Sequence, residues 1–151
     1  MITQTSCTVF QQNLLNGNEN FTTGSYKIAL YTALANLNQQ TAAYTATNEV
    51  VGTGYTAGGK TLVISNTPTQ NTQYNVTYVS FNNVVWNPAS FTARGALVYN
   101  ATTGAACFVL NFGSDKICTT SFTVQFPTAA YNSAILTIGT NTSSINYSSP
   151  D

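Results

Sequence analysis

Charged side chains are scarce in this chain of 151 residues, which has four basic residues, four acidic residues and no histidine. They make up 5% of the sequence, against about 25% in ordinary soluble domains. The net charge is zero and the basic residues are scattered, so no basic cluster can bind phosphates or an anionic surface. We therefore expect no nucleic acid and no membrane among the partners. Because no net charge keeps copies apart, such a surface favours association, which is typical of a structural or adhesive protein.

The residues that common catalytic sites need are also missing. A serine or cysteine nucleophile would have no histidine as its base, and neither Ser-x-x-Lys nor Gly-x-Ser-x-Gly occurs. No Cys-x-x-Cys motif offers a metal site. The carboxylates are far apart in the sequence, at Glu19, Glu49, Asp115 and Asp151. We therefore predict no enzyme activity and assign no catalytic, cofactor-binding or metal-binding residue.

Cysteine is scarce as well, and an odd number, Cys7, Cys107 and Cys118, argues against a disulfide framework. The sequence around the last two predicts a hairpin that turns at residues 113–116, in which Phe112 faces Cys118. Cys107 then lies about five residues further along, on the order of 16 Å away, which is beyond the reach of a disulfide. We predict three free, buried thiols.

Long apolar runs are absent too. The first fifteen residues have no positive region and no long apolar stretch, so we expect no signal peptide. No run approaches the ~18 apolar residues of a membrane-spanning helix. Hydrophobic residues still make up 43% of the chain and aromatic residues 12%, which is enough for one packed core at this length.

The apolar pattern predicts a mainly β protein. A short helix is expected within residues 7–21, where Phe10 and Leu14 lie four apart and Gly17 can end it. From Ser25 onward β-forming runs prevail, and in residues 122–126 apolar side chains alternate with polar ones. We predict an antiparallel β-sandwich, jelly-roll-like, with long loops in its first half.

The chain is treated as a single domain with three parts. Residues 1–24 form an N-terminal arm with the short helix, and residues 25–139 form the β-sandwich. Residues 140–151 form a polar C-terminal tail without periodicity.

Residues 54–61, GYTAGGKT, match the pattern G-x-x-x-x-G-K-[ST] of phosphate-binding loops. Such a loop must open into a helix whose N-terminus holds the phosphates. Here TLVIS follows Lys60 and favours a strand, which Pro68 ends. No carboxylate follows an apolar strand to hold magnesium. We therefore predict a turn in which four glycines supply positive φ angles: Gly52, Gly54, Gly58 and Gly59.

Two single residues have several interpretations. Arg94, the only arginine, lies in a predicted strand; it is either solvated, or paired with Glu49 or Asp115, or a contact across a subunit boundary. Trp86 could form a sugar-binding platform with the nearby amides, although a lone tryptophan in a β-sandwich is usually core. The amides concerned are Asn82, Asn83 and Asn87.

Asn-x-Ser/Thr triplets begin at Asn20, Asn75, Asn100, Asn141 and Asn146. We attribute them to chance, because the chain is rich in Asn and Thr.

Several stretches together resemble a known family. They are CTVFQQNLLNGNENFTTGSYKIALYTALANL, AYTATNEVVGTGYTAGGKTL, FTARGALVYNATTG, and VLNFGSDK with FTVQFPTA, and they extend over most of residues 6–138. The most specific parts are NEVVGTGYTAGG at residues 48–59 and ARGALVYN at residues 93–100. This set resembles small β-rich virion structural proteins of tailed bacteriophages. The resemblance brings no catalytic residues with it.

The resemblance implies a role in virion assembly. We expect a capsid decoration (cement) protein that binds and stabilises the shell of the major capsid protein. It is expected as a homotrimer on the capsid surface, with the N-terminal arm or the polar tail reaching neighbours. Free cysteines suit synthesis in the reducing cytoplasm of the bacterial host. The alternatives are a tail, neck or fibre-associated structural subunit, or a glycan-binding module on the particle surface.

Overall fold

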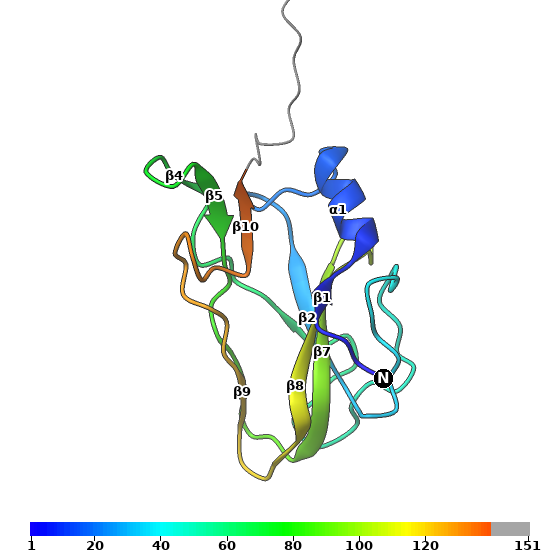
Figure 1. The fold of residues 1–151 in the computed structure, drawn as a ribbon. Helices are drawn as coiled ribbons and strands as arrows, with labels where there is room; N and C mark the ends of the chain where they lie inside the picture. The colour runs from blue at the N-terminus through cyan, green and yellow to red at the C-terminus, as the bar shows by residue number, and fades with distance from the viewer. Residues whose placement is uncertain (140–151) are drawn as a thin grey trace, which may run out of the picture.

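The computed structural model describes residues 1–139, so the predicted polar tail, residues 140–151, lies outside the described residues. Its larger sheet has five strands in the order β1-β8-β7-β2-β3, and each neighbouring pair is antiparallel. Figure 1 shows β1, β8, β7 and β2 of this sheet. The bounds are Thr5–Ser6 for β1, Ala106–Cys118 for β8, Phe91–Asn100 for β7, Tyr26–Tyr31 for β2 and Lys60–Thr61 for β3.

A second layer of strands faces this sheet. It contains a three-stranded sheet in the order β10-β5-β4 and the pair β6-β9. The bounds are Leu136–Gly139 for β10, Val76–Val79 for β5, Thr69–Asn71 for β4, Val84–Trp86 for β6 and Phe122–Val124 for β9. The prediction of a mainly β, antiparallel fold with a sandwich-like arrangement and one short helix is confirmed.

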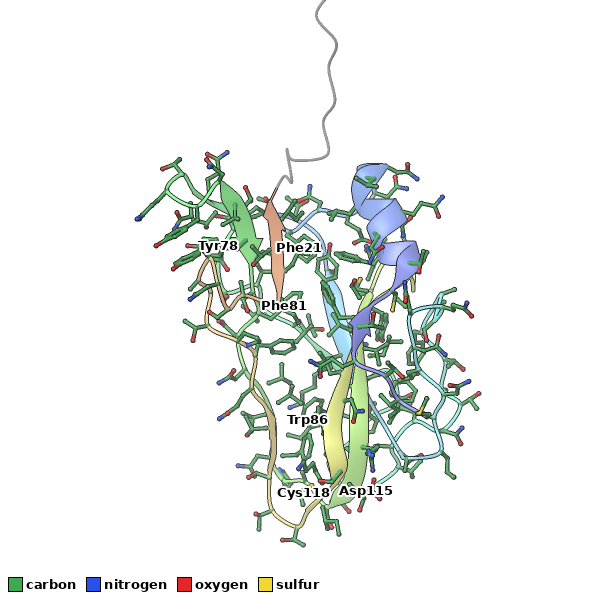
Figure 2. The ribbon with its side chains drawn as sticks, in the orientation of Figure 1. Phe21, Tyr78, Phe81, Trp86, Asp115 and Cys118 are labelled. Carbon is green, nitrogen blue, oxygen red and sulfur yellow. The ribbon has the colours of Figure 1, made fainter. Side chains whose placement is uncertain are left out.

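Aromatic side chains fill the space between the layers. Tyr26 of β2 packs against Phe81, with ring centroids 5.8 Å apart, and Phe91 of β7 packs against Phe122 of β9 at 5.3 Å. Trp86 points into the same space (Figure 2) and is 1% exposed. Burying each such side chain contributes about 1.5–3 kcal/mol, so this layer of rings is a main source of stability.

The outer face of the large sheet is covered by the long loop of residues 32–59, which Figure 1 places on the side of the sheet away from β9. Tyr44 of this loop stacks on Tyr99 of β7 at 4.8 Å, and the Tyr31 hydroxyl donates to the Thr45 carbonyl at 2.6 Å. Because both faces are covered, nearly every residue of β2 and most of β7 are buried.

The N-terminal arm lies along its own domain. The Thr3 N–H donates to the Leu37 carbonyl at 2.9 Å, and Ile2 is buried. Helix α1 (Thr8–Leu15) places Phe10 on Phe108 of β8, with centroids 4.7 Å apart. The arm therefore closes one end of the core. No helix within residues 1–139 is long and apolar enough to cross a membrane.

The predicted hairpin turn at residues 113–116 is wrong. β8 continues through these residues and pairs with β7 on both sides of them. Cys118 lies opposite Phe91 of β7, and not opposite Phe112 as predicted. Figure 2 shows Asp115 and Cys118 near the same end of the sheet. The residues GSDK, 113–116, therefore do not reverse the chain.

Residues 112–115 instead form a bulge in β8. Ala93 pairs with Lys116 and Gly95 pairs with Asn111, so Arg94 alone lies opposite residues 112–115. At the start of the bulge, Gly113 has a φ of 79°. Its N–H donates to the Asn111 side-chain carbonyl at 2.8 Å. The glycine and the asparagine bend the strand outward without reversing it.

The two sides of the sandwich differ in how the layers meet. On one side, Lys60 and Thr61 pair with β2, and Ile64 then bridges to Phe81 of the other layer. This segment joins the layers, and we call it the closed side. On the other side, in the part of the chain described, no strand joins β8 to β9. We call this the open side.

Candidate functional site

The glycine-rich segment at residues 54–61 does not open into a helix. The strand β3 begins at Lys60, as predicted from the residues that follow it. Gly54, Gly58 and Gly59 have φ angles of 79°, 87° and 68°, which confirms the prediction for these three. Gly52 has no positive φ; it is needed because a Cβ there would lie 2.5 Å from the Ser90 carbonyl oxygen.

This loop holds a carboxylate of its own chain. The Gly58 N–H donates to Oε1 of Glu49 at 2.7 Å, and the Tyr55 hydroxyl donates to the same oxygen at 2.5 Å. The Tyr44 hydroxyl donates to Oε2 at 2.7 Å. Glu49 is 7% exposed. The N–H group that a nucleotide-binding loop would offer to phosphate here satisfies Glu49, so the segment is a structural anchor of the closed side.

The tyrosines around Glu49 resist ionisation. Burial and the hydrogen bond to Glu49 raise the pKa of Tyr44 to about 12. The same two causes raise the pKa of Tyr55, against a smaller opposing effect of the Leu30 backbone. An ionised phenol beside this carboxylate would lose its donor and face a like charge. Both hydroxyls therefore stay protonated at neutral pH and keep the carboxylate hydrogen-bonded.

Lys60 stands where a phosphate-binding loop has its lysine, but its ammonium contacts other residues of this protein. Its ammonium donates to the Val85 carbonyl of β6 at 2.6 Å. It also lies over the Trp86 ring, 5.7 Å from the centroid, within the range of a cation–π interaction. Lys60 thereby ties the start of β3 to the second layer.

A second buried carboxylate, Glu19, is held in the same manner. The Tyr26 hydroxyl and the Asn100 amide both donate to its Oε2, at 2.9 and 3.0 Å. Burial, with the Glu19 hydrogen bond and charge as smaller causes, raises the pKa of Tyr26. Glu19 therefore links the N-terminal arm to β2 and β7. Among residues 1–139 every buried side-chain nitrogen and oxygen has a hydrogen-bond partner.

Within the chain, Arg94 pairs with Asp115 and not with Glu49. Its guanidinium lies 3.6 Å from Asp115, whose side chain the bulge of β8 brings opposite it. The two side chains are 36% and 50% exposed. Glu49 is held by the loop instead. Such an exposed pair contributes at most about 1 kcal/mol.

The aromatic platform suggested for Trp86 does not form on the surface. Trp86 is buried between Tyr55 and Phe122, with centroids 6.2 and 6.1 Å away. Of the neighbouring amides, Asn83 accepts from the Phe126 N–H at 2.9 Å, so it fixes the backbone after β9. The tryptophan is a core residue.

The three thiols are free and buried, as predicted. Burial raises the pKa of Cys7 to about 11 and raises that of Cys107 further. The Asn-x-Thr sites differ in access: Asn20 and Asn75 are exposed, whereas Asn100 is buried on Glu19. The triplets at Asn141 and Asn146 lie outside the described residues.

A groove of about 690 Å³ opens between β8 and β9 on the open side. Its polar margin includes Gln4, Asn111, Gln125 and one charged residue, Lys116. Its apolar lining comprises Leu110, Phe112, Phe122, Val124, Phe126 and Ile135. The sequence does not predict this groove, because the supposed turn at residues 113–116 hides the fact that Phe112 lies on a bulge beside β9. The alternation of residues 122–126 was the available signal.

Within residues 1–139 no three carboxylate or thiol groups gather where they could hold a metal ion. Two hydrogen-bonded carboxylate anchors and the groove on the open side thus stand out, and a smaller apolar hollow of about 240 Å³ lies beside β5 and β10. Comparisons of this chain with protein-family models, with curated proteins and with solved structures find no match.

Proposed function

We propose that this chain is a structural protein of the virion of a tailed bacteriophage, and specifically a capsid decoration protein. In this role it binds the shell of the major capsid protein and stabilises it without chemistry. The observation that carries the proposal is the open apolar groove on a domain with almost no charge. The resemblance of residues 48–59 and 93–100 to small virion proteins gives the biological setting.

The rest of the surface supports a role in contacts. Large apolar side chains are exposed at several separate places, and Leu15, Val51 and Ile117 are 89%, 95% and 77% exposed. In a particle each copy makes modest contacts that are repeated many times, so weak individual contacts add up to a stable shell. The low charge removes the repulsion that would oppose dense packing of copies.

The deciding measurement is the number of copies per particle. Virions that carry this chain are purified, and its amount is compared with that of the major capsid protein by quantitative mass spectrometry. A decoration protein is expected at hundreds of copies. A handful of copies per virion would exclude the shell and assign the chain to the tail, the neck or a fibre.

A second measurement tests stabilisation directly. Capsids that lack the chain are heated with and without the purified protein, and the release of DNA is followed by dye fluorescence. We expect added protein to raise the release temperature and to saturate at a fixed ratio to the major capsid protein. Release at the same temperature at every ratio would contradict the stabilising role.

A further inference from the structure

The open side has the form of a site for one more strand. β9 pairs only with β6, and β1 covers the outer edge of β8 only opposite Phe108 and Val109. In the described residues the outer edges of β9 and of the distal half of β8 therefore have no partner strand, although the N–H groups of Asn111 and Gly113 already donate to side chains of Gln4 and Asn111. Unpaired strand edges bind extended chains by adding a strand, and the remaining backbone groups of the two edges are available for this.

The lining of the groove defines which extended chain would fit. Phe112 and Phe122, with ring centroids 5.8 Å apart, belong to its apolar lining, which we call its apolar floor, and Ile135 belongs to the same lining. Gln4 and Gln125 lie at its margins. A strand has side chains that point alternately to opposite faces. The fitting segment would thus have apolar residues two apart on one face and small polar residues on the other.

The chain itself contains such a segment beyond the described residues. Residues 140–151 read TNTSSINYSSPD, and apart from Pro150 their apolar residues are Ile145 and Tyr147, two positions apart. Asn146 and serines surround them. In an extended conformation, Ile145 and Tyr147 would share one face. The twelve residues can span about 40 Å, so the segment can reach beyond its own domain.

We propose that residues 143–148 of a second copy occupy the groove as an added strand, with Ile145 and Tyr147 on its apolar floor. The path of the chain favours a second copy. Ile135 lies at the groove, and β10 then leads from Leu136 to Gly139, which pairs with Val76. The chain thus leaves the groove for about 13 Å before the tail begins.

The chain's own tail would have to reverse within residues 140–142 to return to the groove. A neighbouring copy needs no such reversal. A reciprocal exchange gives a twofold dimer, and a head-to-tail exchange gives a closed ring such as a trimer. The exchange does not depend on the virion role: copies per particle measure that role, and self-association of the purified chain measures the exchange, so either can fail alone.

The first experiment measures self-association of the full chain by sedimentation. Ile145→Asp places a charge on the groove-facing side of the tail, and Asn146→Asp is its matched control on the opposite face. Exchange predicts an oligomer whose dissociation constant rises at least about tenfold in Ile145→Asp and changes less than about twofold in Asn146→Asp. A monomeric full chain, or equal effects of the two substitutions, would overturn the proposal.

The second experiment separates the two halves of the contact. Phe112→Asp blocks the groove, and Ile117→Asp, exposed on the same strand, is its control. Each variant is checked by the fluorescence of Trp86 to be folded. Phe112→Asp is expected to abolish self-association and Ile117→Asp to preserve it; the reverse result would assign the interface to another surface. Should Phe112→Asp fail to fold, the tail variants test the same contact without a substitution in residues 1–139.

Mixing decides between exchange and a tail that folds back on its own domain. The Phe112→Asp chain keeps a normal tail, and a chain with Ile145→Asp and Tyr147→Asp keeps a normal groove. Exchange predicts that each is monomeric alone and that the mixture forms a 1:1 complex. A mixture that stays monomeric while the unaltered chain is an oligomer contradicts exchange of this segment.

Discussion

The two sides of the sandwich differ in their side chains: the closed side is held by polar groups and the open side is lined mainly by apolar ones. The closed side has a carboxylate that accepts three hydrogen bonds, glycines pressed against backbone, and a lysine that reaches the other layer. The open side has aromatic and aliphatic side chains around a groove and a bulged strand. Polar groups with defined geometry lock a seam in one arrangement, whereas an apolar groove with free strand edges can accept another chain. Substitutions on the two sides should therefore differ in what they disturb.

The largest expected effect is that of Gly59→Ala. A Cβ at this position would lie 1.7 Å from the Ile28 carbonyl oxygen, and the φ of 68° is itself unfavourable for alanine. The backbone of the closed side would have to move, so we expect a loss of more than about 4 kcal/mol in the free energy of unfolding. Urea titration followed by the fluorescence of the single tryptophan measures it.

The matched control is Gly113→Ala on the open side. Its φ is 79°, but nothing lies within 4 Å of the added Cβ. Only the conformational cost remains, about 1–2 kcal/mol. Equal losses for the two substitutions would show that close approach does not matter at Gly59 and would remove the difference between the sides.

The next effect is expected for Glu49→Ala. It leaves the Gly58 N–H and the hydroxyls of Tyr44 and Tyr55 without their acceptor in a buried place. Each unsatisfied buried donor costs about 1–3 kcal/mol, so we expect a loss of about 3 kcal/mol or more. Glu49→Gln keeps one acceptor oxygen and should lose clearly less. A full loss with Gln would contradict this expectation and show that one acceptor oxygen does not hold the loop.

High pH should lower the free energy of unfolding by less than Glu49→Ala does and by more than Arg94→Ala does. The pKa of Tyr44 is raised from 10.0 to about 12 in the folded protein, so the folded state holds this proton more tightly than the unfolded chain. The resulting stability is complete below pH 10 and is lost as the pH rises through about 12. We expect the urea midpoint to fall over this window and to fall less steeply in Tyr44→Phe. Parallel curves for the two proteins would contradict this role of Tyr44.

The smallest effect is expected for Arg94→Ala beside the bulge. The pair with Asp115 is 3.6 Å long and exposed to solvent, so its removal should cost less than about 1 kcal/mol. The loss should shrink further at high salt, because the charges are screened. A loss above about 2 kcal/mol would show that the bulge depends on this ion pair.

The sequence predicted the fold where local chemistry decides it. Alternation in residues 122–126 predicted the buried face of β9, and Phe122 and Val124 are buried while Thr123 is exposed. The β-forming run after Lys60 excluded a helix, and β3 begins there. Positive φ was predicted correctly for Gly54, Gly58 and Gly59, because glycine adopts it at low cost, and wrongly for Gly52. These inferences depend only on neighbours along the chain.

The bulge of β8 could not be predicted from neighbours along the chain. Asn111 and Gly113 do form a local turn of the backbone, but whether the chain reverses there depends on β7 pairing on both sides of residues 112–115. Glu49 is a similar case. Its partners Tyr44, Tyr55 and Gly58 are near in sequence, yet no motif marks them as ligands of one carboxylate.

The sequence alone determined the β class, the short helix, the absence of a helix after GYTAGGKT and the near absence of surface charge. Each follows from local propensity or from counting side chains. The tertiary structure alone decided that one side of the sandwich is closed by Glu49 and Lys60, and that the other opens as an apolar groove beside Phe112. Those features arise when strands distant in sequence are paired, and pairing is set by the packing of the whole core, which no short segment encodes.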